Sequence, residues 1–314
     1  MKRLRLVPDR TNVPFMRWRT YFGVGSIAAA IISAILFVVV GANYGIDFRG
    51  GTLIEVRTSG PADLGAMRAA LSDEGLGEVA LQEFGAPTDV LIRVERQEGD
   101  ASAQQAAVAV VKKALARDVG GEIGYRRVEV VGPKVSGELI RAGVLALVLA
   151  LGAMLIYIWL RFEWQFSVGA VAALVHDVLL TVGLFAVTGL DFNLATIAAI
   201  LTIIGYSMND TVVIFDRVRE NLRKFKTMEL GPLIDRSLNE TLSRTVVTSA
   251  TTLLALLALR FIGGEVIESF TVAMIWGVVI GTYSSIFVAC PTLLYLRVRR
   301  GAAVAGGEAG QGAD

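Results

Sequence analysis

The chain has 314 residues, of which 54% are hydrophobic and only 19% are charged. Soluble domains average about 45–50% apolar and about 25% charged residues, so this composition indicates a membrane protein. The single cysteine, Cys290, excludes an internal disulfide, and the single histidine, His176, excludes a multi-histidine metal site. The formal charge of +1 gives no basic face that would bind nucleic acid.

Six stretches are apolar over the length that a transmembrane helix needs, about 20 residues. The sequence therefore predicts a polytopic α-helical membrane protein with six transmembrane helices. The first apolar run is longer than the core of a signal peptide, so we expect it to remain as an uncleaved anchor. The predicted spans are residues 21–42, 142–160, 167–188, 195–215, 246–262 and 270–296.

Basic residues are concentrated in residues 1–20, in residues 216–245 and directly after the sixth span. The positive-inside rule places all three in the cytoplasm, so both termini are expected there. Residues 43–138 then lie outside the cytoplasm, and residues 139–300 form a five-helix transmembrane domain whose cytoplasmic segment is 216–245. The Gly- and Ala-rich tail, residues 301–314, is predicted to be disordered and cytoplasmic.

The segment 43–138 is the only part with the composition of a soluble domain. Alternating strand patterns and two amphipathic helical patterns follow one another in the order β-α-β-β-α-β. That order is typical of the ferredoxin-like unit, so we expect one α+β ferredoxin-like periplasmic domain between the first and second spans. The fold alone does not indicate a task, because it supports many functions.

Nucleotide binding is not supported. Residues 132–137 have the glycine spacing of a P-loop, but Glu138 and Leu139 occupy the positions of the lysine and the hydroxyl residue that bind phosphate and magnesium. The sequence therefore predicts no cofactor, and any work that the protein drives must come from another source.

Asp210 lies within the fourth apolar span, where an ionised side chain costs about 2.5–3.5 kcal/mol or more and is a functional hypothesis by default. The next span runs antiparallel and begins beside Arg244, which is followed on one face by Thr248. The spacing predicts that Asp210 faces Arg244 and that protonation of the carboxylate would release the arginine. The alternative is that both residues lie at headgroup level, with Arg244 snorkelling and Asp210 capping a helix end.

Asp177 lies beside His176 near the middle of the third span, with apolar sequence on both sides. This pair is either a second functional site or a hydrogen-bonded polar cluster that joins neighbouring helices. In the sixth span, Gly277, Gly281 and Ser285 form a small-residue face, which predicts close helix packing.

Five blocks resemble the bacterial protein-export membrane proteins of the SecD/SecF family, which are similar to the resistance-nodulation-division transporters. The first contains Asp47, Arg49, Gly50 and Gly51. The others are residues 131–138, His176-Asp177, residues 205–221 and residues 239–245.

The resemblance implies a non-enzymatic protein of the bacterial inner membrane that pairs with SecD and joins the SecYEG channel, often with YajC and YidC. It implies that the proton-motive force promotes translocation of precursor proteins, with protons as the coupling ion. By motif, Asp210 looks like the proton-titrating carboxylate, Arg244 like its charged partner and Asn209 like a residue that orients the site.

Two other functions remain open at this point. The chain could be half of a proton-coupled small-molecule transporter of the same superfamily. It could also be an intramembrane aspartyl protease, because Asp177 and Asp210 lie on consecutive spans and paired carboxylates can share a proton. Proteases of that kind carry a Gly-x-Gly-Asp block, whereas Tyr-Ser-Met-Asn precedes Asp210 here.

Overall fold

The structure, a computed structural model, describes residues 11–99, 101–119, 122–263 and 267–296, together with residues 8 and 298. Within these residues, six helices are long and apolar enough to cross a membrane, which confirms the predicted polytopic helical architecture. The predicted disordered tail, 301–314, lies outside the described residues. The spans are Phe15–Val39, Lys134–Arg161, Trp164–Thr188, Leu194–Lys224, Leu230–Ile262 and Glu268–Tyr295.

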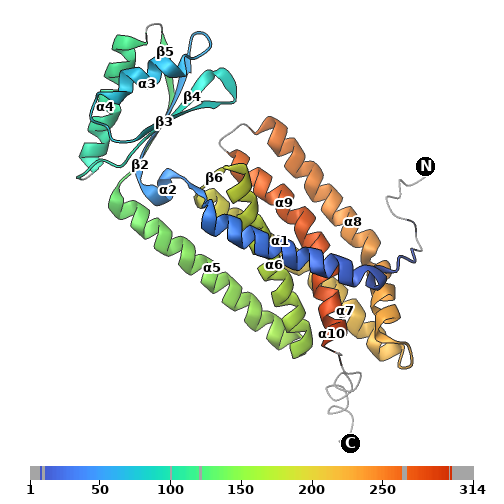
Figure 1. The fold of residues 1–314 in the computed structure, drawn as a ribbon. Helices are drawn as coiled ribbons and strands as arrows, with labels where there is room; N and C mark the ends of the chain where they lie inside the picture. Colours follow the sequence, from blue (N-terminus) through green and yellow to red (C-terminus); the bar gives the residue numbers. More distant parts are fainter. Residues whose placement is uncertain are drawn as a thin grey trace, which may run out of the picture. The chain divides into compact units, whose positions relative to one another are not determined.

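The chain folds into two compact units. The helical unit comprises residues 1–42, 148–190 and 195–314, and the sheet unit comprises residues 43–147 and 191–194. The elements of the helical unit are shown in Figure 1. They are η1 (Phe15–Trp18), α1 (Arg19–Val39), the second half of α5 (Pro133–Arg161), α6 (Trp164–Thr188), α7 (Leu194–Lys224), α8 (Leu230–Ile262), α9 (Glu268–Ser284), the π-helical turn η3 (Ser285–Ala289) and α10 (Cys290–Tyr295).

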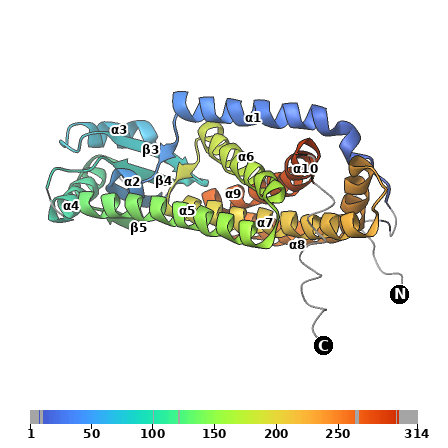
Figure 2. The ribbon, with the colours of Figure 1, turned by 90° about the horizontal axis from the view of Figure 1, so that it is seen from below.

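Burial separates an inner from an outer set of helices. Over their most apolar 18 residues, α6 and the span formed by α9, η3 and α10 have 56% and 50% of their residues buried, compared with 6%, 11% and 11% for the spans that contain α1, α5 and α8. Figure 2 shows α6 and α10 between α1 and α8. The apolar side chains on the outer helices therefore face lipid or another protein, because nothing in this chain covers them in the described residues.

Small residues bring α9 against α7. A Cβ atom added to Gly281 would lie 2.9 Å from the Cβ atom of Ser207, and one added to Gly277 would overlap Ile203. The small-residue face predicted in the last span is therefore a packing surface, where glycines let two helix backbones approach closely.

The helices extend beyond the apolar runs that predict them. Because α7 ends at Lys224 and α8 begins at Leu230, the segment 216–245 forms helix extensions and a short turn, with no separate surface helix. Val218 and Leu233 are fully buried, so the extensions have an apolar face of their own. Likewise α5 begins at Pro133, well before residue 142, because proline fits the first position of a helix.

The sheet unit carries a four-stranded antiparallel sheet with the order β3-β4-β2-β5. Its core lies between the sheet and two helices and includes Ile54, Met67, Ile92 and Val111, each fully buried. Ile54 on β2 and Ile92 on β4 are paired across the sheet and point to the face that the two helices cover, where Met67 and Val111 meet them. The elements are β2 (Gly51–Thr58), α3 (Leu64–Ser72), β3 (Val79–Phe84), β4 (Ala86–Val94), α4 (Ala101–Asp118) and β5 (Ile123–Val131).

A second, two-stranded sheet joins distant parts of the sequence. β1 (Asn43–Tyr44) pairs in parallel with β6 (Asp191–Phe192), which lies between α6 and α7. A four-residue helix, α2 (Ile46–Arg49), follows β1. Neither short strand was predicted, since two residues give no periodic signal.

Candidate functional site

Asp177 is fully buried at the middle of α6. Its Oδ1 atom lies 3.0 Å from Nδ1 of His176, and its Oδ2 atom accepts hydrogen bonds from the hydroxyls of Ser207 at 2.6 Å and Ser284 at 2.8 Å. These partners come from α6, α7 and α9. Both carboxyl oxygens are therefore satisfied, as in the polar cluster that the sequence left open, and the hydrogen bonds join three inner helices.

Asp210 has a different environment. Its Oδ1 atom accepts a hydrogen bond of 2.6 Å from the hydroxyl of Thr245 on α8. Its Oδ2 atom is enclosed but has no hydrogen-bond partner among the described residues. An enclosed carboxyl oxygen without a partner is costly, so this atom is the one in the site that gains most from a proton or a new donor.

The predicted ion pair between Asp210 and Arg244 is not formed in this structure: no ion pair within 4 Å joins these two described residues. Thr245 occupies the position facing Asp210, and Arg244, one residue earlier and therefore rotated by about 100° around the helix, is exposed. Asn209 and Thr248 are exposed as well, so the structure does not show Asn209 orienting the carboxylate. We call Asn209, Asp210, Arg244 and Thr248 the α7–α8 polar face.

Hydroxyl groups support this region from neighbouring helices. Ser249 lies 2.7 Å from Thr282 and accepts a longer bond of 3.4 Å from Tyr206, while Thr211 lies 2.7 Å from Ser285. Of these residues, Ser285 was predicted only as part of a packing face, and Thr211, Ser249 and Thr282 were not predicted. Their signal was available, because Thr245 and Ser249, like Ser207 and Thr211, are spaced four residues apart on one face of an apolar helix.

The block with Asp47, Arg49, Gly50 and Gly51 lies at the start of β2. Gly50 and Gly51 have φ angles of 73° and 110°, and a Cβ atom on Gly51 would lie 2.5 Å from the carbonyl oxygen of Val94. Only glycine fits both requirements. Asp47 accepts a hydrogen bond of 2.9 Å from the backbone amide of Leu194, the first residue of α7. Arg49 is exposed and takes no part in this contact.

Arg93 forms further hydrogen bonds to residues near the contact between Asp47 and Leu194. Its guanidinium donates to Asn43 at 3.0 Å and to Asp191 at 2.8 Å, and Asn43 also donates to Asp191 at 2.8 Å. Together with the pairing of β1 and β6 and the bond to Asp47, these contacts hold residues 191–194 within the sheet unit. We call this set of contacts the 191–194 latch.

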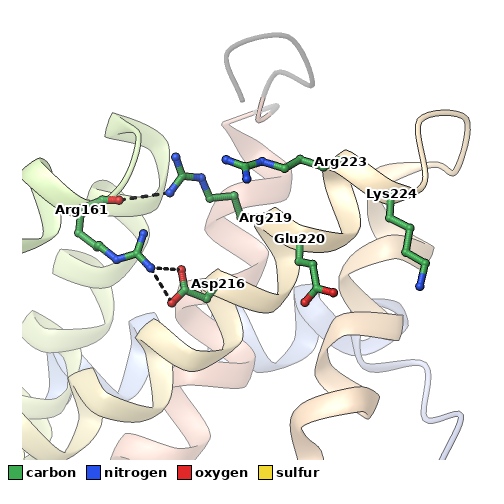
Figure 3. Close-up of a pocket in the computed structure, with 6 residues that line it drawn as sticks. All are labelled: Arg161, Asp216, Arg219, Glu220, Arg223 and Lys224. Carbon is green, nitrogen blue, oxygen red and sulfur yellow. Dashed lines mark hydrogen bonds and ion pairs between the residues drawn. The ribbon is translucent and has the colours of Figure 1, made fainter. Parts of the chain in front are cut away.

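A charged pocket of about 450 Å³ lies in the helical unit, at the ends of α5 and α7 (Figure 3). Arg161 pairs with both carboxylate oxygens of Asp216, at 2.9 and 3.0 Å, and Arg219 donates to the carbonyl oxygen of Arg161 at 3.4 Å. The remaining lining residues are Glu220, Arg223 and Lys224. The cations outnumber the carboxylates, in agreement with the basic charge that predicts orientation for this segment.

A sequence profile described as protein export membrane protein SecD/SecF, C-terminal, matches residues 111–299, and the SecD/SecF GG motif matches residues 35–62. The chain belongs to the SecD/SecF family. It is 47% identical to the protein translocase subunit SecF of Cereibacter sphaeroides over 95% of this chain and 94% of that protein. It is 49% identical to that of Rhodobacter capsulatus over 95% of this chain and 93% of that protein.

Two solved structures of the family resemble this one. A crystal structure of SecDF, a translocon-associated membrane protein from a Thermus species, has a TM-score of 0.81 and 34% identity and covers 94% of this chain. A SecDF structure in a super-membrane-facing form has a TM-score of 0.69 and 35% identity and covers 96%. This chain spans only 40% and 41% of those chains. Family membership and the six apolar helices make it a multi-pass protein of the bacterial inner membrane.

Proposed function

We propose that this protein is a non-enzymatic auxiliary subunit of the Sec protein translocase and that protonation of Asp210 couples the proton-motive force to protein export. The observation that carries the proposal is the carboxylate of Asp210, which has one bonded and one unpartnered oxygen inside a membrane helix. A membrane-embedded acid with spare hydrogen-bonding capacity is suited to exchange a proton.

The charge of Asp210 would set the packing of the α7–α8 polar face. When the carboxylate is ionised, it attracts the guanidinium of Arg244, the residue before Thr245 on α8. When the carboxylate is protonated, this attraction disappears. Asn209 adds an amide that can bond to either form. One charge moving through 100 mV supplies about 2.3 kcal/mol, enough to shift a two-state packing equilibrium substantially.

The exposed polar groups of this face argue for a partner. Arginine, asparagine and threonine side chains on a membrane helix are unfavourable against lipid, so a neighbouring protein that supplies polar groups would cover them. We propose SecD as that partner, because the related SecDF chains are more than twice as long as the part matched here. By family resemblance the complex would act at the SecYEG channel on precursor proteins, with YajC and YidC as further partners.

We further propose that both termini are cytoplasmic and that residues 43–138 form a ferredoxin-like domain outside the cytoplasm. The strand order β3-β4-β2-β5 with two helices supports that fold, and the basic segments support that orientation. The 191–194 latch would pass motion outward, because α7 begins inside the latch and carries Asp210 further along the same helix.

Export into inverted membrane vesicles that contain the full complex tests the proposal. Asp210→Asn should abolish the stimulation of export by the proton-motive force and leave co-purification with SecD unchanged, because the amide cannot gain or lose a proton. Asp216→Asn is the matched control on the same helix and should retain stimulation. Full stimulation in Asp210→Asn vesicles would refute proton coupling, and altered susceptibility to small toxic compounds without an export defect would instead favour the transporter function.

A further inference from the structure

A long apolar groove of about 600 Å³ lies within the helical unit, between α1 on one side and α6, η3 and α10 on the other. It is separate from the Asp210 site and from the charged pocket. Small residues on one face of α1, namely Gly23, Ser26, Ala30 and Ala34, leave the space that larger side chains would fill.

Near one end of the groove's lining, α1 and α6 come close together. A Cβ atom added to Gly183 on α6 would lie 3.0 Å from the Cα atom of Ser33 on α1, so the two backbones touch there. Most of the groove's lining on α1 lies between this contact and the start of the helix. Ile27 and Ile31 line it and are 63% and 54% exposed, so the groove is open along its side to the surrounding membrane.

A cation lies at one end of the groove. The Nε atom of Arg19 is enclosed and has no hydrogen-bond partner among the described residues, although Nη1 donates to the carbonyl oxygen of Met16 at 2.9 Å. Asp235 is engaged by the amide of Met16 at 2.8 Å and forms no ion pair with Arg19 within 4 Å. Trp18 and Tyr295 near this end are 50% and 64% exposed, as expected of aromatic side chains at the headgroup level.

A buried ring nitrogen without a partner among the described residues lies further along the groove. His176 lines it, is 5% exposed, and its Nε2 atom has no partner among the described residues. Nδ1 of His176 faces Oδ1 of Asp177, and when Nδ1 accepts the hydrogen bond from the carboxyl group, the hydrogen of the neutral ring is on Nε2. In that tautomer the buried Nε2–H group is a donor that needs an acceptor.

The two polar groups have a fixed order along the groove. The His176 ring stacks on Tyr283 with centroids 5.9 Å apart, and the Tyr283 hydroxyl lies 2.7 Å from the hydroxyl of Ser26. His176 is thus at the level of Ser26, which is seven residues, or about 10 Å, from Arg19 along α1. Arg19, the unpartnered ring nitrogen of His176 and an apolar channel therefore follow one another along the described part of the groove.

We propose that this groove binds one anionic glycerophospholipid. The phosphate would pair with Arg19, an ester carbonyl would accept the hydrogen bond from Nε2 of His176, and an acyl chain would fill the apolar part beside Ala30. This order of groups along the lipid matches the order in the groove, and charge complementarity favours a lipid over an uncharged apolar helix.

Native mass spectrometry of the full chain, purified in mild detergent and delipidated, measures this binding when phosphatidylglycerol is added back. We expect the first phosphatidylglycerol molecule to bind with clearly higher affinity than any further molecules. Ala30→Trp should fill the groove and remove that binding step, whereas Ala28→Trp, on the exposed side of the same helix, should retain it. Arg19→Gln should weaken binding about tenfold, and Arg17→Gln, exposed and outside the groove, should not.

A change of probe tests the role of His176 without altering the protein. The ether-linked analogue of phosphatidylglycerol lacks the carbonyl oxygens and should bind about fivefold more weakly than the ester. Equal binding by Ala30→Trp and Ala28→Trp, or equal binding of ester and ether lipids, would overturn the proposal. A photocrosslinker at position 27 that captures SecD or a second copy of this chain, and no lipid, would also overturn it.

Discussion

Asp177 and Asp210 are both carboxylates within apolar stretches of membrane-spanning helices, and their surroundings differ. Asp177 on α6 is fully buried and has hydrogen-bond partners at both oxygens, drawn from three helices. Asp210 on α7 has a partner at one oxygen only and lies beside the exposed Arg244 and Asn209. Burial alone therefore does not identify a coupling residue. A carboxylate with hydrogen-bond partners at both oxygens stabilises the helix bundle. A carboxylate with a partner at only one oxygen is free to change its protonation state.

Asp177 and Asp210 are not paired in the way that an aspartyl protease requires. A shared proton requires two carboxylates in contact, as in the aspartic-protease pair. In this structure Asp177 binds His176, Ser207 and Ser284, whereas Asp210 binds Thr245, and no hydrogen bond joins the two described carboxylates. The arrangement thus offers no support for a catalytic dyad.

Removing the carboxylate of Asp177, which has partners at both oxygens, should have the largest effect on stability. Asp177→Ala leaves Ser207, Ser284 and His176 without their acceptor inside the bundle, and we expect a loss of about 3–5 kcal/mol in the free energy of unfolding. Thermal unfolding of the purified protein in detergent measures this. The Asp210→Asn variant should unfold close to the wild type. If Asp177→Ala were as stable as wild type but inactive in export, the roles assigned to the two carboxylates would be wrong.

Packing around Asp177 gives the next largest effect. Gly281→Ala would bring a methyl group to 2.9 Å from the Cβ atom of Ser207, which donates to Asp177. Overpacking of this kind costs about 1–3 kcal/mol. Gly205→Ala is the matched control, because nothing lies within 4 Å of its added Cβ atom, and it should leave stability unchanged or raise it by up to about 1 kcal/mol. Equal melting temperatures for the two variants would contradict the close contact.

Much of this architecture was predictable, for a physical reason. Apolar runs of span length and the position of Asp210 within one of them are local properties of the sequence, and the structure has six such helices among its described residues. Asp210 bonds to Thr245 rather than to the predicted Arg244. Which of these two neighbouring residues faces Asp210 depends on how α8 is rotated about its axis, and interhelical packing decides that rotation. Likewise, Ser207 and Ser284 reach Asp177 from other helices, and no pattern within α6 reveals them.

The 191–194 latch shows the same limit over a longer distance. Asp47 and Leu194 are 147 residues apart, and the two strands that bring them together contain two residues each. A family motif drew attention to Asp47, but its partner could be identified only in three dimensions. The latch gives this motif residue a physical role, as an acceptor at the first turn of the helix that carries Asp210.

Substitutions at Asp47 test whether the 191–194 latch affects the function that we propose for Asp210. Asp47→Ala removes the acceptor of the Leu194 amide, which should cost about 0.5–2 kcal/mol and lower export that depends on the proton-motive force. Asp47→Asn keeps an acceptor at the same place and should remain near wild type. If Asp47→Asn were as impaired as Asp47→Ala, negative charge rather than the hydrogen bond to α7 would be the property that export requires.

Asp89 in the sheet unit provides a third carboxylate, outside the membrane spans, and the smallest expected effect. Hydrogen bonds of 2.6 Å from Arg57 lower the pKa of Asp89, with a further contribution from the charge of Arg126, while burial acts in the opposite direction. Because its pKa is lower in the folded state, Asp89 stabilises the sheet unit above its unfolded pKa, near 3.9. This stabilisation is lost as the pH falls through the lowered folded value.

Hydrogen exchange of β2 and β4 in the full chain, corrected for the intrinsic rate at each pH, measures that dependence. Asp89→Asn should exchange faster than wild type at neutral pH, and the difference should close below the folded pKa of Asp89, where the wild-type carboxyl is protonated. Asp73→Asn, which alters an exposed carboxylate outside the sheet, should match wild type throughout. A gap between Asp89→Asn and wild type that persisted undiminished in acid would show that shape, not charge, holds Arg57 at this position. Arg57 and Asp89 form the guanidinium–carboxylate bond that Arg244 and Asp210 do not form. The acid sensitivity of the Arg57–Asp89 pair therefore measures how much such a bond contributes to stability in contact with water.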